Sequence, residues 1–131
     1  MSDSQSDDIE DIREKKAEQL QSRLETPEDP VHVESRDHLG EVVSSNDVVL
    51  VDFYADWCGP CQMLEPILES IAAETPAAVA KVDIDRHRDI AGEFGVQGIP
   101  MLALFADGEQ AEEPVGLQDQ DTLTDLIEQY A

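Results

Sequence analysis

Residues 48–61 read VVLVDFYADWCGPC and give the strongest structural signal in the chain. The first eight of them, 48–55, are rich in β-branched and aromatic side chains and are apolar on both faces, which is typical of a strand in the centre of a sheet. A Gly-Pro break follows, and from Pro60 to Glu74 apolar residues recur at helical spacing. We therefore expect a buried strand that leads into a helix, which Pro66 should kink.

Shorter signals on both sides of this unit alternate between strand and helix. We expect further strands at 31–33, 77–84, 101–106 and 109–115, and further helices at 35–44, 86–94 and 119–130. The Asp107-Gly108 pair predicts a hairpin between the last two strands. Glu112, Glu113 and Pro114 suit the second of these strands to a sheet edge. Alternating strands and helices followed by a hairpin indicate an α/β sheet covered by helices.

Residues 1–30 differ from the rest of the chain. They are polar and acidic, contain no aromatic residue, and end in the breaker-rich stretch TPEDP at 26–30. Their few apolar residues fall at sparse helical spacing and could bury little surface. We expect 1–30 to be a largely disordered or marginally helical extension in front of one folded domain, 31–131; a helix that docks a partner is the alternative.

The chain of 131 residues is strongly acidic, with 31 Asp and Glu against 8 Lys and Arg and a formal net charge of −23. Nucleic acids and anionic membranes are bound through clustered Lys and Arg, so we expect neither as a partner. The acidic residues also run through the segments with strand and helix patterns. We hypothesise adaptation to a salt-rich cytoplasm, because molar salt screens the repulsion between surface charges.

Both cysteines of the chain fall in Trp57-Cys58-Gly59-Pro60-Cys61, between the buried strand and its helix. Pro60 suits the first helical turn, so Cys58 would lie at the helix N-terminus, where free N–H groups and the helix dipole favour a thiolate. A thiolate attacks disulfides, and Cys61 lies one turn away, where it can close a ring with Cys58. The pair therefore predicts a reversible two-electron switch, and a C-x-x-C in this setting is the usual mark of a thioredoxin-like redox site.

Three other uses of the cysteines are weaker. A purely structural disulfide would close a very short loop and add only about 2 kcal/mol. A zinc site usually takes four ligands, and the three histidines show no ligand spacing. A nucleophilic hydrolase needs a histidine base, and nothing in the sequence places one near Cys58.

The chain resembles the thioredoxin family. The run from Val51 to Cys61, VDFYADWCGPC, looks like the family signature almost throughout, and QMLEP at 62–66 is similar to the family's kinked helix. KVDID at 81–85, GIP at 98–100 and VG at 115–116 match further family motifs in order. The resemblance covers about residues 31–131. It implies the thioredoxin fold, a central mixed β-sheet flanked by helices on both faces.

The resemblance also implies catalytic roles. Cys58 would attack the substrate disulfide, and Cys61 would be the buried cysteine that resolves the mixed disulfide. Asp52 would lie under the site and exchange a proton with Cys61; a carboxylate within an apolar strand is unusual, and burial raises its pKa. Lys81, the one lysine after residue 16, would lie near Asp52 as a charge partner. Gly59 would support the site between the cysteines, together with Pro60.

A substrate-binding region follows from the same resemblance. The peptide bond before Pro100 would be cis and would face the cysteines, leaving the backbone of Ile99 to pair with an extended substrate segment. An apolar groove around Cys58 would be lined by Trp57, Gly98, Ile99 and Gly116. Three positions depart from the usual family pattern: Tyr54, Gln62 and Met101 stand where the family often has Trp, Lys and Thr.

These observations predict a thiol-disulfide oxidoreductase that acts as a reductant. Gly-Pro between the cysteines resembles the reducing members of the family. The mechanism needs no bound cofactor; electrons would come from a separate reductase, a flavoprotein using NADPH in the family. We expect a cytoplasmic monomer that acts on protein disulfides, since the N-terminus lacks a secretory signal and two cysteines suit a reducing compartment. Two alternatives stay open: a disulfide-forming oxidant, with a potential above about −200 mV, and a binding module on the same fold.

Overall fold

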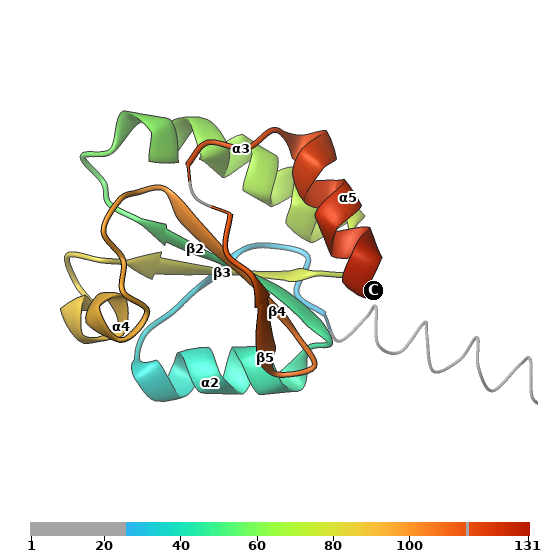
Figure 1. The fold of residues 1–131 in the computed structure, drawn as a ribbon, viewed down its shortest axis with the longest axis horizontal. Coiled ribbons are helices and arrows are strands. Elements are labelled where there is room, and N and C mark those ends of the chain that lie inside the picture. Colours follow the sequence, from blue (N-terminus) through green and yellow to red (C-terminus); the bar gives the residue numbers. More distant parts are fainter. Residues whose placement is uncertain (1–25, 115) are drawn as a thin grey trace, which may run out of the picture.

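The computed structural model describes residues 26–114 and 116–131, and a mixed sheet of five strands forms its centre (Figure 1). The strands are β1 (Val31–His32), β2 (Val48–Tyr54), β3 (Ala78–Asp83), β4 (Met101–Ala106) and β5 (Glu109–Glu112), in the spatial order β1-β3-β2-β4-β5. The helices are α2 (Arg36–Ser45), α3 (Gly59–Glu74), α4 (Arg88–Glu93) and α5 (Gln120–Tyr130). The predicted α/β class and order of elements are confirmed.

Strand β2 is the central strand, as the sequence predicts. It runs parallel to β3 on one side and antiparallel to β4 on the other. Its side chains alternate between two apolar clusters, with Val49, Val51 and Phe53 in one and Val48 and Leu50 in the other. Because both faces of β2 are covered, the strand needs apolar residues at consecutive positions.

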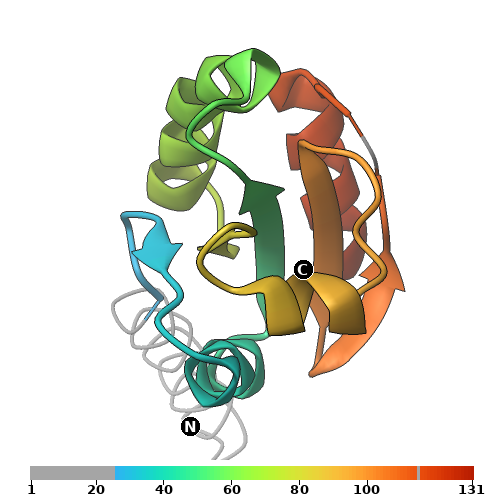
Figure 2. The ribbon, with the colours of Figure 1, turned by 90° about the vertical axis from the view of Figure 1, so that its left-hand side faces the viewer.

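Helices cover the sheet on both faces (Figures 1 and 2). Helices α3 and α5 lie on one face, where Leu64, Leu68 and Leu123 pack on the even-numbered residues of β2. Helices α2 and α4 lie on the other face, through residues such as Leu39 and Ile90. The family resemblance implies this arrangement. The C-terminal end of β2 is connected to the start of α3 by a short segment.

The hairpin at the sheet edge forms where the sequence predicts it. Strands β4 and β5 pair antiparallel, and Asp107 and Gly108 between them have φ of 52° and 84°. Two successive residues with positive φ form the turn that matches strand twist. Strand β5 lies at the edge of the sheet, which tolerates its two charged residues.

Some element ends differ from the prediction. Helix α4 begins at Arg88 and not at Arg86, because the Asp83 carboxylate accepts the N–H groups of Asp85 and Arg86 and holds them in a turn. Strand β5 ends at Glu112, short of the predicted 115. Pro114 has no N–H to give to a sheet, so the regular pairing stops before it, although its carbonyl still accepts the N–H of Leu102 on β4.

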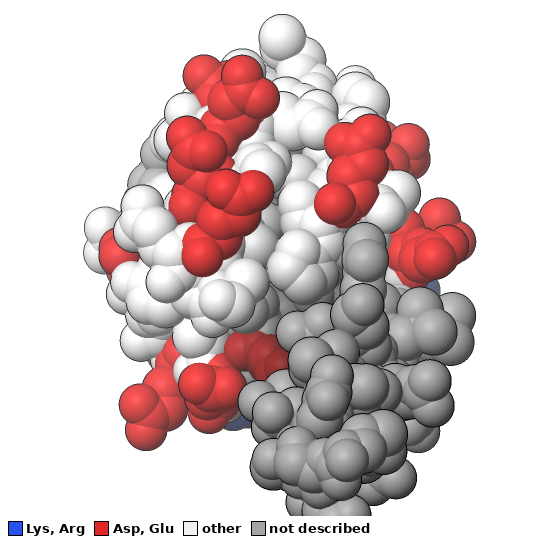
Figure 3. Space-filling model, turned by 90° about the vertical axis from the view of Figure 1, so that its right-hand side faces the viewer, with Lys and Arg blue, Asp and Glu red and all other residues white. Residues whose placement is uncertain are grey.

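The predicted N-terminal extension falls mostly on residues 1–25, which lie outside the described residues. Residues 26–30 form neither helix nor strand. In the part of the chain that is described, no helix is long and apolar enough to cross a membrane. Asp and Glu side chains lie in several separate groups on the face shown in Figure 3, as expected for acids distributed along the whole sequence.

Candidate redox site

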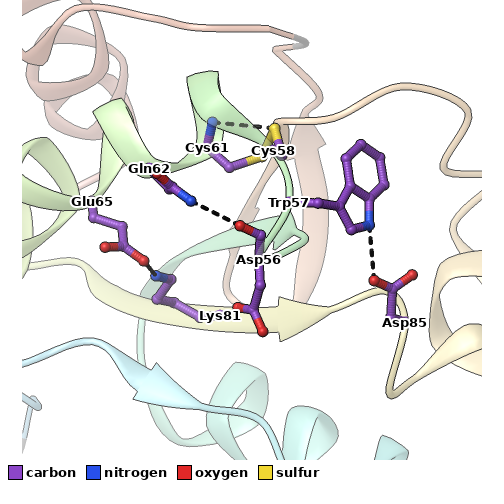
Figure 4. The surroundings of a disulfide bond; sticks show 8 residues. All are labelled: Asp56, Trp57, Cys58, Cys61, Gln62, Glu65, Lys81 and Asp85. Carbon is purple, nitrogen blue, oxygen red and sulfur yellow. Dashed lines mark hydrogen bonds and ion pairs between the residues drawn. A yellow bond between two sulfur atoms is a disulfide. The ribbon is translucent and has the colours of Figure 1, made fainter.

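The two cysteines lie where strand β2 passes into helix α3, and they form a disulfide with their Cα atoms 5.2 Å apart (Figure 4). Cys58 is the N-cap of α3, and its Sγ accepts the N–H of Cys61 at 3.2 Å. Cys58 is 5% exposed and Cys61 is 2% exposed. The sequence prediction of a closable pair at a helix start is therefore confirmed in its geometry.

The first turn of α3 favours a thiolate at position 58. The helix begins at Gly59, and Pro60 occupies the first turn without costing a hydrogen bond, as predicted. The N–H of Cys61 points to the sulfur of Cys58, and the positive end of the helix dipole lies at the same place. Both effects stabilise negative charge on that sulfur when the disulfide is reduced.

The surroundings of the pair are apolar on the inner side and open on the outer side. Ala55 is buried with the cysteines, and Tyr54, Ile84 and Ile99 pack against them. Trp57, by contrast, is 70% exposed, and its indole N–H donates to the Asp85 carboxylate at 2.9 Å (Figure 4). An aromatic ring thus stands in solvent beside Cys58, held in place by a residue from the loop after β3.

The segment before β4 brings three more of the predicted residues to this end of the molecule. The Ile99–Pro100 peptide bond is cis, as the resemblance implies. Ile99 is half-buried, Pro100 is buried and Gly98 is exposed. The Gly116 N–H donates to the Pro100 carbonyl at 2.8 Å, and Gly116 has a φ of 90°, a conformation that suits glycine. Ile99 is thus the member of this group that packs against the cysteine cluster.

Asp52 lies on β2 with its side chain on the face covered by α3. It is fully buried, and within the described part of the chain neither carboxylate oxygen has a hydrogen-bond partner. The pKa of Asp52 is raised to about 7, mainly by burial and to a smaller extent by the charge of Glu65, against the opposing attraction of Lys81. A carboxyl group that changes charge near neutral pH can take up and release a proton under working conditions.

Lys81 is the neighbour of Asp52 on β3, but its hydrogen bond goes elsewhere. Its side chain is 7% exposed, and Nζ lies 3.1 Å from the Glu65 carboxylate (Figure 4). The same ammonium lies 4.5 Å from the centre of the Tyr54 ring. Lys81 therefore acts on Asp52 through its charge, while its ion-pair partner is Glu65.

Glu65 is the residue of this cluster that sequence reasoning missed. It lies on α3 four residues after Cys61, so both side chains belong to one side of the helix. That spacing was the available signal. The contact of Glu65 with Lys81 on β3 depends on how α3 packs on the sheet, and the spacing of residues along the helix does not determine that packing.

Among the described residues, no group of three or more His, Cys, Asp or Glu is placed to hold a metal ion. The donor atoms at this site are two sulfurs already joined to each other. A cysteine pair joined at the start of a helix can carry out exchange at sulfur.

Comparison with known proteins gives a consistent result. The family model described as Thioredoxin matches residues 29–129. The thioredoxin of Chlamydia muridarum is 48% identical over 101 residues, covering 76% of this chain and 98% of that protein. The thioredoxin of Bacillus subtilis is 37% identical over 100 residues, covering 75% and 96%. Among solved structures, an N21Q mutant thioredoxin from the halophile Halobacterium salinarum is 60% identical with a TM-score of 0.78, covering 80% of this chain and 93% of that one.

Proposed function

Because this chain belongs to the thioredoxin family and is a thiol-disulfide oxidoreductase, we propose a definite role for each cysteine: Cys58 attacks the substrate and Cys61 resolves. The observation that carries this proposal is the Cys58–Cys61 disulfide at the start of α3. Cys58 is the N-cap and receives the N–H of Cys61, so the negative charge of a thiolate is stabilised there.

The reaction proceeds by two exchanges at sulfur. The Cys58 thiolate attacks one sulfur of the substrate disulfide, whose S–S bond breaks and whose other sulfur leaves as a thiolate. The Cys61 thiol then loses its proton and attacks the Cys58 sulfur, forming the Cys58–Cys61 disulfide and releasing the second substrate thiolate. The two released thiolates take up protons. The substrate thus gains the two electrons that the cysteine pair loses; one of its two protons balances the one that Cys61 gave up, and the other comes from solvent.

Asp52 accepts the proton that Cys61 loses. Its burial beneath α3 and its pKa of about 7 support this role, because such a carboxylate is a stronger base than an exposed one and is still ionised in part at neutral pH. Lys81 supplies the positive charge that keeps an ionised form accessible.

The substrate chain binds beside Cys58, along the predicted substrate-binding residues Trp57, Gly98, Ile99 and Gly116. The exposed ring of Trp57 offers apolar surface, and Ile99 packs against the cysteines from the opposite loop. Gly98 and Gly116 lack side chains that would obstruct an extended segment. Backbone pairing at Ile99, next to the buried Pro100, would fix the direction of that segment.

The family works through its redox-active disulfide without a prosthetic group, and its members act on protein disulfides and are re-reduced by a reductase. We propose that this chain is re-reduced by a separate flavoprotein using NADPH. We also propose that it works as a monomer in the cytoplasm, where thiols are kept reduced. Residues 31–131 would form the catalytic domain, in agreement with the family match over 29–129.

A disulfide-reduction assay with dithiothreitol at high salt tests the roles of the cysteines. Wild type should accelerate the reduction of a protein disulfide, and Cys58→Ser should abolish that acceleration. Cys61→Ser should instead stall as a mixed disulfide with the substrate, seen as a covalent adduct by mass spectrometry. An adduct that accumulates on Cys61 in Cys58→Ser, with none on Cys58 in Cys61→Ser, would reverse the assignment.

A further inference from the structure

We propose that Glu65 is a positioning residue for proton transfer at this site: by binding Lys81 it draws the lysine's charge away from Asp52 and keeps the Asp52 carboxyl protonated up to higher pH. The inference deepens the proposed function, because it rests on Asp52 as the proton acceptor for Cys61. It concerns a residue that acts on Asp52 through a second side chain, that of Lys81.

The geometry places Lys81 between two carboxyl groups. Lys81 and Asp52 are neighbours on paired parallel strands, and both lie on the face covered by α3. The Lys81 ammonium is nonetheless bonded to Glu65 at 3.1 Å, and both oxygens of Asp52 are left without a partner among the described residues. The buried Lys81 ammonium therefore contacts the Glu65 carboxylate directly and acts on the Asp52 carboxylate only at longer range.

Two adjoining hollows meet at Glu65. One, of about 290 Å³, is lined by Tyr54, Ala55, Asp56, Cys61, Gln62 and Glu65. The other, of about 370 Å³, is lined by Lys81 and Glu65 among others. The Glu65 side chain is 50% exposed, whereas that of Lys81 is 7% exposed. Glu65 therefore stands at the surface between the resolving cysteine and the buried lysine.

The charges around Asp52 act in opposite directions. From β3, Lys81 lowers the pKa of Asp52; from α3, Glu65 raises it, and burial raises it most. The phenol of Tyr54, on the same strand, also interacts electrostatically with Asp52. Among the described residues, Asp56 lines the hollow that Glu65 shares with Cys61, and Asp29, His32 and Glu69 line the hollow that it shares with Lys81. The neighbour from β4 is Leu102, and α5 packs on this face through the apolar side chains of Leu123 and Ile127.

The test compares Glu65→Gln with Glu69→Gln in the oxidised full-length protein. Glu69 is exposed one turn further along α3 and lines the same hollow as Lys81, so its variant removes an equal charge from the same helix. The titration of the Asp52 carboxyl is followed by ¹³C NMR at the lowest salt that keeps the protein folded. Glu65→Gln should lower the midpoint by roughly half a pH unit or more. Glu69→Gln should leave it in place.

A parallel pH profile of disulfide reduction separates this inference from the proposed function. Below neutral pH the wild-type rate should fall as Asp52 gains its proton. In Glu65→Gln this fall should occur at a lower pH. In Asp52→Asn the fall that is due to protonation of residue 52 should be absent. An Asp52→Asn profile identical to wild type would overturn the role of Asp52 itself. If Asp52→Asn behaves as expected and the midpoint for Glu65→Gln coincides with wild type, the role of Glu65 alone is overturned.

Discussion

Replacing Asp52 by Asn should make the stability of the protein less dependent on pH, in a direction that the structure fixes. The carboxyl is buried without a hydrogen-bond partner among the described residues, and burial raises its pKa to about 7. In the unfolded chain its pKa returns to the ordinary value of 3.8. Between these two values the folded state holds a proton that the unfolded state has lost, so unfolding becomes easier as the pH rises.

The size of the effect follows from the two pKa values. They differ by about three pH units, and one unit corresponds to about 1.4 kcal/mol. The wild type should therefore lose about 4 kcal/mol of unfolding free energy from this one group between acid pH and pH 8. The loss begins near pH 4 and ends once the pH has passed about 7. The Asp52→Asn variant has no ionisable group at this position and avoids this loss, although its buried amide still carries a cost that is the same at every pH.

Urea unfolding of the oxidised proteins at pH 4 and pH 8, at one fixed ionic strength, measures the difference. The advantage of Asp52→Asn over wild type should grow by about 4 kcal/mol between these pH values. Asp125→Asn on the exposed surface of α5 is the control, because it removes the same charge from a chain of net charge −23. If the unfolding free energies of Asp52→Asn and Asp125→Asn, each relative to wild type, change by the same amount between pH 4 and pH 8, Asp52 is not buried as an isolated carboxyl and the reasoning fails.

Two further predictions concern stability. The melting temperature should rise from low to molar salt, because screening reduces the repulsion within a chain of net charge −23; a flat dependence would contradict adaptation to high salt. Ser35→Ala should cost about 1 kcal/mol of unfolding free energy, since Ser35 caps α2 and accepts the His38 N–H at 3.0 Å. Urea unfolding of Ser35→Ala and of Ser35→Asp, which keeps a capping oxygen, checks this, and equal losses in both would contradict it.

The fold could be predicted because local patterns and long-range packing agree in most of its elements. Apart from Asp52, the residues of β2 are apolar at consecutive positions, as a strand covered on both faces requires, and the structure covers it on both faces. Asp107-Gly108 predicts its turn from the backbone preference of the two residues alone. The ends of α4 and β5 were harder to predict, since the start of α4 depends on backbone N–H groups that the Asp83 carboxylate accepts and the end of β5 depends on Pro114, which has no N–H.

In the site, too, the local features could be predicted from the sequence and the long-range contacts could not. The placement of Cys58 and Cys61 follows from their spacing at a strand-to-helix junction, which is a local property. The partner of Lys81 is not local, because it depends on which turn of α3 lies over β3. The sequence reasoning placed Lys81 beside Asp52, and the strands do pair these residues, but the helix brings Glu65 within 3.1 Å of the ammonium.

The rate at which Cys58 is alkylated as a function of pH tests the central claim most directly. In the reduced protein, iodoacetamide followed by mass spectrometry should label Cys58 ahead of Cys61, with a midpoint below the value of about 8.5 for a free cysteine. The N-cap position of Cys58 and the N–H of Cys61 directed at its sulfur are the physical reasons. Labelling that begins only near pH 8.5, or that falls first on Cys61, would contradict an attacking thiolate at Cys58.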